Sequence, residues 1–109
     1  MARVHLSFEA KEDLKSIRAY ISEELNNSEA AKNVVERIIR RMEQLQQFPA
    51  MGAALSSVIE PETNYRFLVS GSYLIFYRIE KDDVYVDRIL YGKRDYLKIL
   101  FKGKTDELS

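Results

Sequence analysis

The chain of 109 residues contains no cysteine and no tryptophan, and it has one histidine, two prolines and four glycines. Without cysteine it has no disulfide framework, no thiol nucleophile and no cysteine-based zinc site. The histidine, His5, alternates with Val4 and Leu6, so we expect a structural or solvent-facing side chain there rather than a triad member or a zinc ligand. No glycine pair marks a nucleotide-binding loop. We therefore expect neither a metal nor a cofactor.

The chain also lacks a net charge and a long apolar run. Its 17 Lys and Arg balance 17 Asp and Glu. No apolar stretch approaches the roughly 18–20 residues of a membrane span, and the first five residues do not resemble a signal peptide. With 46% hydrophobic residues, the composition is that of an ordinary globular protein. We expect a single cytoplasmic domain covering residues 1–109.

The first half of the chain predicts a strand followed by two helices. Residues 3–8 alternate between apolar and polar side chains, as in a half-buried strand. Apolar residues then recur at spacings of three and four over residues 9–25, which predicts an amphipathic helix. Asn26 and Asn27 interrupt this pattern, and Ser28 is placed to cap a second helix that ends near Gln47, before Pro49. A short polar link between two such helices predicts an antiparallel hairpin.

The second half predicts a three-stranded antiparallel meander. After a loop over residues 50–63, the apolar runs 64–69, 73–79 and 84–91 are separated by the short turns 70–72 and 80–83. Asp95 is placed to cap a short helix through Phe101. The expected fold is α+β in the order β-α-α-β-β-β, with the helices packed on one face of the sheet. The run 73–79 is apolar on both faces, which predicts a central strand. We expect the other face to be open or otherwise covered and to be lined by Leu68, Leu74, Phe76 and Arg78.

Chemistry, if present, has to come from arginine, lysine and tyrosine. Residues 86–104 hold six cations and two anions, with aromatic side chains interleaved. Such a segment is either a solvated face or a surface for phosphates and bases. RNA cleavage through the 2′-hydroxyl needs a base, an acid and cations at the phosphate. The candidate catalytic residues are Arg94, Arg66 and Tyr96. The candidate residues for binding a target or nucleic acid are Arg78, Arg88, Lys93 and Lys98.

Several short motifs in order resemble the RelE/ParE superfamily of toxins from bacterial type II toxin–antitoxin systems. The resemblance covers about residues 3–101. It rests on Ala19-Tyr20-Ile21, the Ala30-Ala31 helix start, Leu45-Gln46-Gln47-Phe48-Pro49 with Gly52, Tyr65-Arg66-Phe67-Leu68-Val69, Tyr73-Leu74-Ile75-Phe76-Tyr77-Arg78 and Gly92-Lys93-Arg94. Each motif is weak alone, but their order and spacing are specific for the family.

The resemblance implies a growth-inhibiting toxin with a cognate antitoxin and leaves its target open. RelE-like members cleave mRNA on the ribosome, whereas ParE-like members act on DNA gyrase. Arg94 matches the arginine of the RelE pattern, but Arg66, Leu68 and Leu74 depart from it. The resemblance therefore favours a ParE-like toxin, of the kind associated with plasmid stabilisation. The alternatives are a ribosome-dependent endoribonuclease and a non-toxic module that retains only antitoxin binding.

Overall fold

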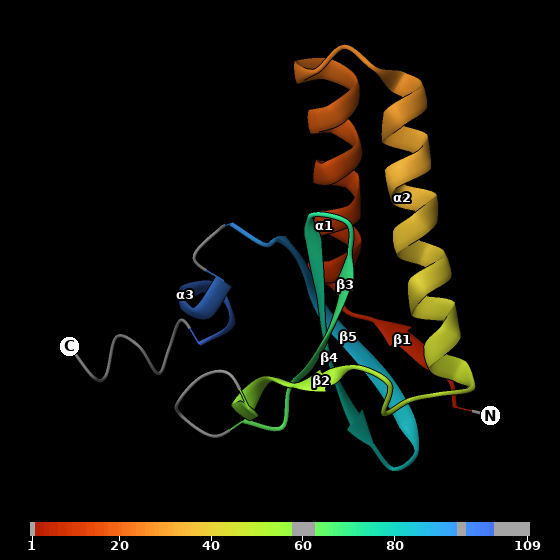
Figure 1. The fold of residues 1–109 in the computed structure, drawn as a ribbon, viewed down its shortest axis with the longest axis vertical. Coiled ribbons are helices and arrows are strands. Elements are labelled where there is room, and N and C mark those ends of the chain that lie inside the picture. The colour runs from red at the N-terminus through yellow and green to blue at the C-terminus, as the bar shows by residue number, and fades with distance from the viewer. Residues whose placement is uncertain (1, 58–62, 94–95, 102–109) are drawn as a thin grey trace.

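The computed structural model describes residues 2–57, 63–93 and 96–101. The elements are, in chain order, β1 (Val4–Leu6), α1 (Phe8–Ala19), a π-helical turn (Tyr20–Glu24), α2 (Ser28–Glu43), a 3₁₀ turn (Gln44–Gln46), β2 (Ala53–Ala54), a second 3₁₀ turn (Leu55–Ser57), β3 (Arg66–Ser70), β4 (Tyr73–Glu80), β5 (Asp83–Tyr91) and α3 (Tyr96–Leu100). The hairpin of α1 and α2 extends well beyond one end of the sheet (Figure 1). Every helix in the described residues is too short or too polar to cross a bilayer.

Both long helices begin at side-chain caps. The Ser7 hydroxyl accepts a hydrogen bond from the Ala10 amide at 3.0 Å, and Asn27 Oδ1 accepts one from the Ala30 amide at 2.9 Å. Each cap satisfies one of the amides that the first helical turn leaves unpaired. The cap of α2 is thus Asn27, one residue before the expected Ser28. Asn26 turns the chain between the helices with a φ of 50°, which asparagine tolerates better than most residues.

The sheet has the strand order β1-β5-β4-β3-β2. The meander β3-β4-β5 is antiparallel and β4 is central, as predicted, whereas β1 pairs in parallel with β5. The short strand β2 lies within the expected loop over residues 50–63, where it pairs with the first two residues of β3. A two-residue strand of alanines has too little pattern to be recognised before its partner is known.

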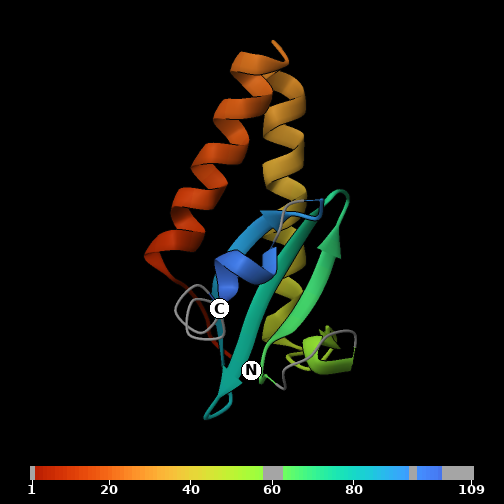
Figure 2. The same cartoon turned by 90° about the vertical axis from the view of Figure 1, so that its left-hand side faces the viewer.

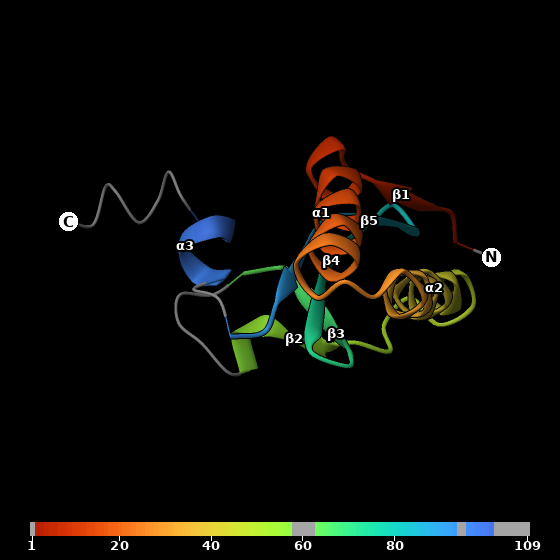
Figure 3. The same cartoon turned by 90° about the horizontal axis from the view of Figure 1, so that it is seen from above.

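Side chains cover the sheet on both faces. The helix-covered face buries a cluster that includes Ile38 of α2 with Ile75, Tyr77 and Val86 of the strands. On the far face, Phe76 packs with Leu55 and Leu90, and α3 lies against them. Figures 2 and 3 show α3 on the side of the strands opposite α2. The α+β architecture with both long helices on one face is confirmed.

One residue expected on the far face lies on the other side. Leu68 pairs in register with Ile75 and belongs to the helix-covered cluster. The prediction for Leu68 is therefore wrong, because strand pairing places side chains opposite each other on the same face. Leu74, Phe76 and Arg78 do lie on the far face, but α3 and the turn at Leu55 cover the apolar part of it.

Ile38 and Phe76 are both fully buried, one on each face of the sheet. Truncating either to alanine should lower the free energy of unfolding by roughly 2–5 kcal/mol, because the cavity adds to the lost transfer energy. Urea denaturation followed by circular dichroism measures the change. Val69→Ala is a suitable control, because the Val69 side chain is 51% exposed. A loss below about 0.5 kcal/mol for both buried positions would contradict this assignment of the core.

Candidate functional site

The polar part of the far face is built around a β-bulge in β5. The register between β4 and β5 shifts between Phe76 and Tyr77, so Phe76 lies opposite Arg88 and Tyr77 lies opposite Val86. Asp87 is the extra residue of β5. A bulge redirects side chains that regular alternation would send to opposite faces. As a result, Asp87 contacts Tyr65 and Arg78 on the far face, and Arg88, the next residue, contacts Asp13 of α1.

The Asp87 carboxylate binds two side chains of the far face, those of Tyr65 and Arg78. Its Oδ2 accepts hydrogen bonds from the Tyr65 hydroxyl at 2.9 Å and from Arg78 Nε at 2.9 Å. Burial, followed by the hydrogen bond to Asp87, raises the pKa of Tyr65 from 10.0 to about 12. Both effects favour the neutral phenol over the phenolate. The phenol is positioned as a hydrogen-bond donor to the carboxylate rather than as a general base.

Arg88 is held by a carboxylate from α1. Its Nε and Nη2 donate to the two oxygens of Asp13, both at 2.8 Å, and the Ile89 amide donates to Asp13 Oδ2 at 2.9 Å. This bidentate pair raises the pKa of Arg88, with the Asp13 hydrogen bond as the main cause. Asp13 thus connects α1 to Arg88 and Ile89, the two residues of β5 that follow the bulge.

Arg78 is engaged in a similar way. Besides Asp87, it forms an ion pair with Glu80. Its guanidinium carbon lies 5.0 Å from the centre of the Tyr85 ring, and the His5 ring stacks on Tyr85 with centroids 4.8 Å apart. His5 Nε2 also lies 3.1 Å from Asp83 Oδ2. As expected, His5 has a structural environment on the surface.

Arg66 does not join this group. Its register partner is Tyr77, which places it on the helix-covered side of the sheet. Its Nε and Nη2 donate to the Gly52 carbonyl at 3.1 and 2.7 Å, and Nη2 also donates to the Ala50 carbonyl at 3.0 Å. Arg66 therefore holds the loop before β2 and makes no contact with Arg78 or Arg88.

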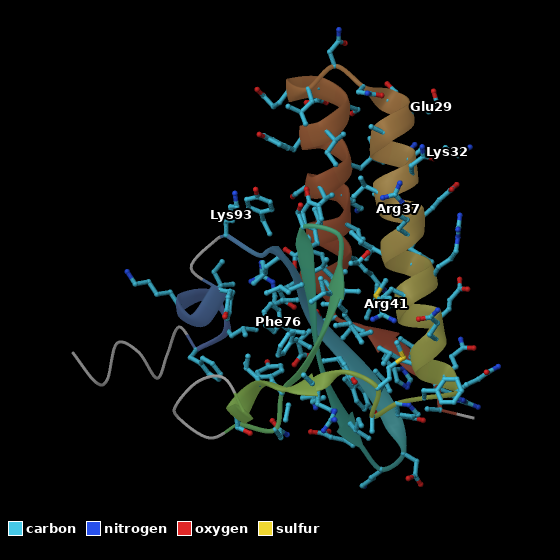
Figure 4. The ribbon with its side chains drawn as sticks, viewed as in Figure 1. Glu29, Lys32, Arg37, Arg41, Phe76 and Lys93 are labelled. Carbon is cyan, nitrogen blue, oxygen red and sulfur yellow. The ribbon has the colours of Figure 1, made fainter. Side chains whose placement is uncertain are left out.

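The other candidate residues that the structure describes lie on α3 or just after β5. The Tyr96 ring lies 5.3 Å from the Phe76 ring, where it packs as part of α3. Lys98 is exposed on α3, and Lys93 is exposed just after β5 (Figure 4). Arg94 lies outside the described residues. The structure therefore does not bring Arg66 and Tyr96 into one catalytic group.

A shallow depression of about 280 Å³ lies beside the bulge and is lined by Ser7, Glu9, Tyr65, Asp87, Arg88, Ile99 and Leu100. Its arginine is already paired with Asp13, so it offers no free cation to a phosphate. In the parts of the chain that the structure describes, no three carboxylates or histidines gather as a metal site.

Sequence reasoning missed the residues that organise this face, namely Asp13, Tyr65 and Asp87. One signal was present in the sequence. The buried residues Val84 and Val86 of β5 are two apart, but the next residue buried on the same face is Ile89, three further on. This break in the two-residue period indicates a bulge. The partner of Asp13 lies 75 residues away, which no local pattern reports.

The fold and the far face together define a small α+β protein with a helical hairpin on one side of the sheet and an ion-paired face on the other. The family profile described as ParE toxin of the type II toxin–antitoxin system parDE matches residues 4–96. The chain belongs to this family of type II toxins.

A solved structure supports the same fold. The chain is similar, at 22% identity and a TM-score of 0.72, to a chain from the chromosomal ParDE toxin–antitoxin system of P. aeruginosa. The match covers 85% of this chain and 98% of that one. No curated protein sequence matches the chain significantly.

The raised pKa of Tyr65 gives a testable dependence of stability on pH. Between pH 10 and about 12 the unfolded chain loses the Tyr65 proton and the folded chain keeps it, so unfolding becomes easier as the pH rises. Below pH 10 this contribution is fully present. The Tyr65→Phe variant should show a shallower loss of stability across this interval than the parent in urea titrations. Equal slopes for the two proteins would contradict the assigned environment of Tyr65.

Proposed function

We propose that this toxin inhibits DNA gyrase, is neutralised by a cognate antitoxin and does not cleave RNA. Membership of the ParE family supports the first part. The observation that carries the last part is the engagement of the three candidate arginines that the structure describes. Arg78 and Arg88 are paired with carboxylates, and Arg66 binds backbone carbonyls.

A ribonuclease of the RelE type needs cations that are free to stabilise the charge that develops on the phosphate. An arginine already bound to a carboxylate contributes less to this task, because the carboxylate cancels its field and would itself repel the phosphate. Tyr96 is packed against Phe76 rather than beside a free cation. These contacts favour a toxin that acts by binding a protein target.

The antitoxin site that we propose lies along β3 and α2. The short strand β2 pairs only with Arg66 and Phe67, so the second half of β3 has no strand partner on that edge among the described residues. Val69 is exposed there, and its carbonyl accepts a hydrogen bond from Arg41 Nε at 3.2 Å. An extended segment with apolar and acidic side chains could add to this edge and meet Arg41. Arg41 and Arg37 lie along α2 in Figure 4.

The proposal has consequences for the cell. An inhibitor of gyrase acts in the cytoplasm and stops growth when its antitoxin is lost, and this is how such a pair stabilises a plasmid. A chain that retained only antitoxin binding would show no such growth effect. Growth inhibition therefore separates a toxin from a non-toxic binding module.

The target is tested with the two residues that a ribonuclease would need most. Arg94→Ala and Tyr96→Phe should both keep full toxicity when induced in bacteria, and primer extension on cellular mRNA should reveal no cleavage by the parent. The purified parent should inhibit supercoiling by gyrase. Loss of activity by about 10²–10³ in Arg94→Ala, together with transcript cleavage by the parent, would instead establish the endoribonuclease.

Neutralisation is tested by co-expression with the small protein encoded beside the toxin. The two proteins should co-purify, and growth should be restored. Val69→Pro should weaken the complex, because proline at this edge removes a backbone donor and hinders strand addition. Val69→Thr, which keeps the donor and the branched shape, serves as the matched control. Failure of the parent to associate at micromolar concentration would count against the antitoxin assignment.

A further inference from the structure

The open edge of β3 is capped by an arginine from α2. Because β2 pairs only with Arg66 and Phe67, Val69 has no strand partner on that edge among the described residues. Arg41 Nε donates to the Val69 carbonyl at 3.2 Å, and Arg41 Nη1 donates to Gln44 Oε1 at 2.8 Å. The guanidinium therefore occupies the acceptor that the backbone amide of an added strand would use.

This cap protects an edge that is otherwise prone to pairing. An open strand edge is a template for another chain, including a second copy of the same protein, and natural proteins commonly cover such edges with charged side chains. The Val69 side chain is 51% exposed, so the edge offers apolar surface as well as backbone groups. The bond from Arg41 removes the Val69 carbonyl from this template.

The charge of Arg41 has no carboxylate partner in the part of the chain that the structure describes. The same is true of Arg37, which lies four residues earlier on α2 (Figure 4). Arg40, by contrast, lies 3.7 Å from Glu36. Like charges four residues apart on a helix repel each other. A carboxylate bound between Arg37 and Arg41 would relieve this repulsion and accept hydrogen bonds from both.

The two arginines follow the open edge in space. α2 and β3 run in opposite directions (Figures 1 and 2), so Arg37 lies beyond Arg41 in the direction in which β3 runs. An extended acidic peptide that pairs with β3 at Val69 would pass both arginines. A strand edge binds the backbone of a peptide, which nucleic acid lacks, so the combination of edge and arginines favours a peptide.

We propose that Arg41 is a guard of the β3 edge that changes partner when the antitoxin binds. In the free toxin it caps the Val69 carbonyl and keeps the edge from pairing with a second copy. When an extended acidic segment of the antitoxin pairs with β3, a backbone amide of that segment takes over the Val69 carbonyl. A carboxylate of the segment then binds Arg41 and Arg37. This inference rests on the proposed antitoxin site and adds the exchange of partners to it.

The guard is tested in the free, full-length toxin by sedimentation velocity, with circular dichroism to compare the folding of the variants. Arg41→Ala should self-associate at a concentration at least about tenfold lower than the parent. Adding Val69→Pro to Arg41→Ala should reverse this, because proline removes the backbone donor of the edge. Arg41→Gln should stay as monomeric as the parent, since glutamine Nε2 lies as many bonds from the backbone as arginine Nε and also donates.

The exchange of partners is tested by titrating the antitoxin into the same variants. Arg37→Ala, Arg41→Ala and Arg41→Gln should each bind at least about tenfold more weakly than the parent, because each lacks one cation of the pair. The matched control is Arg40→Ala, which loses the same charge from the same helix. It should bind as tightly as the parent and remain as monomeric. Arg41→Gln thus keeps the guard and loses the carboxylate site.

Each role of Arg41 has its own contradicting result. If free Arg41→Ala is as monomeric as the parent, or if Val69→Pro does not reverse its self-association, Arg41 is not a guard. If Arg37→Ala and Arg41→Ala bind the antitoxin as tightly as Arg40→Ala, the exchange of partners is wrong. Binding of the parent to duplex DNA, lost in the same two variants, would instead establish a nucleic-acid surface. If the parent does not bind the antitoxin, the proposed partner fails, and the self-association experiment still decides the guard.

Discussion

The structure depends on the complete burial of two consecutive residues of β4, Phe76 and Tyr77. Because neighbouring strand residues point to opposite faces, the sheet has to be covered on both sides. The helical hairpin covers Tyr77, and α3 with the turn at Leu55 covers Phe76. The buried Tyr77 hydroxyl is satisfied, since it donates to the Pro49 carbonyl at 2.7 Å and accepts from the Gly52 amide at 2.9 Å. This pair of bonds also orders the loop that leads to β2.

The need to cover both faces of the sheet also explains why Arg66 and Arg88 have structural roles. The elements that cover the sheet are short, so side-chain bonds between segments that are distant in the chain are needed to hold them in place. Asp13 with Arg88 fastens α1 to β5, and Arg66 fastens the loop at Gly52 to β3. Partly buried charges of this kind are retained only when they are well paired. A face built from satisfied ion pairs is poorly suited to phosphate chemistry, because Arg78 and Arg88 are already bound to carboxylates.

Much of the fold could be predicted because it depends on local pattern. The spacing of apolar residues indicated both helices, and aromatic and β-branched runs indicated β3, β4 and β5. The parallel pairing of β1 with β5, the strand β2 and the placement of Leu68 could not be read in this way. Each depends on which backbone lies beside another and in which register, and a shift of one residue changes the face of every side chain.

The sequence by itself determined the α+β class, the central double-sided strand and the absence of cysteine chemistry, since composition and periodicity decide these directly. It also contained motifs specific enough to indicate the toxin family. Only the tertiary structure decided which cations were free. Arg88 appeared in a basic segment, but its partner Asp13 comes from a helix 75 residues earlier, and the rings of Tyr73 and Tyr91 come together only in the folded sheet. Charge and exposure belong to the assembled surface, because a partner that cancels a charge or covers a ring can come from any part of the chain.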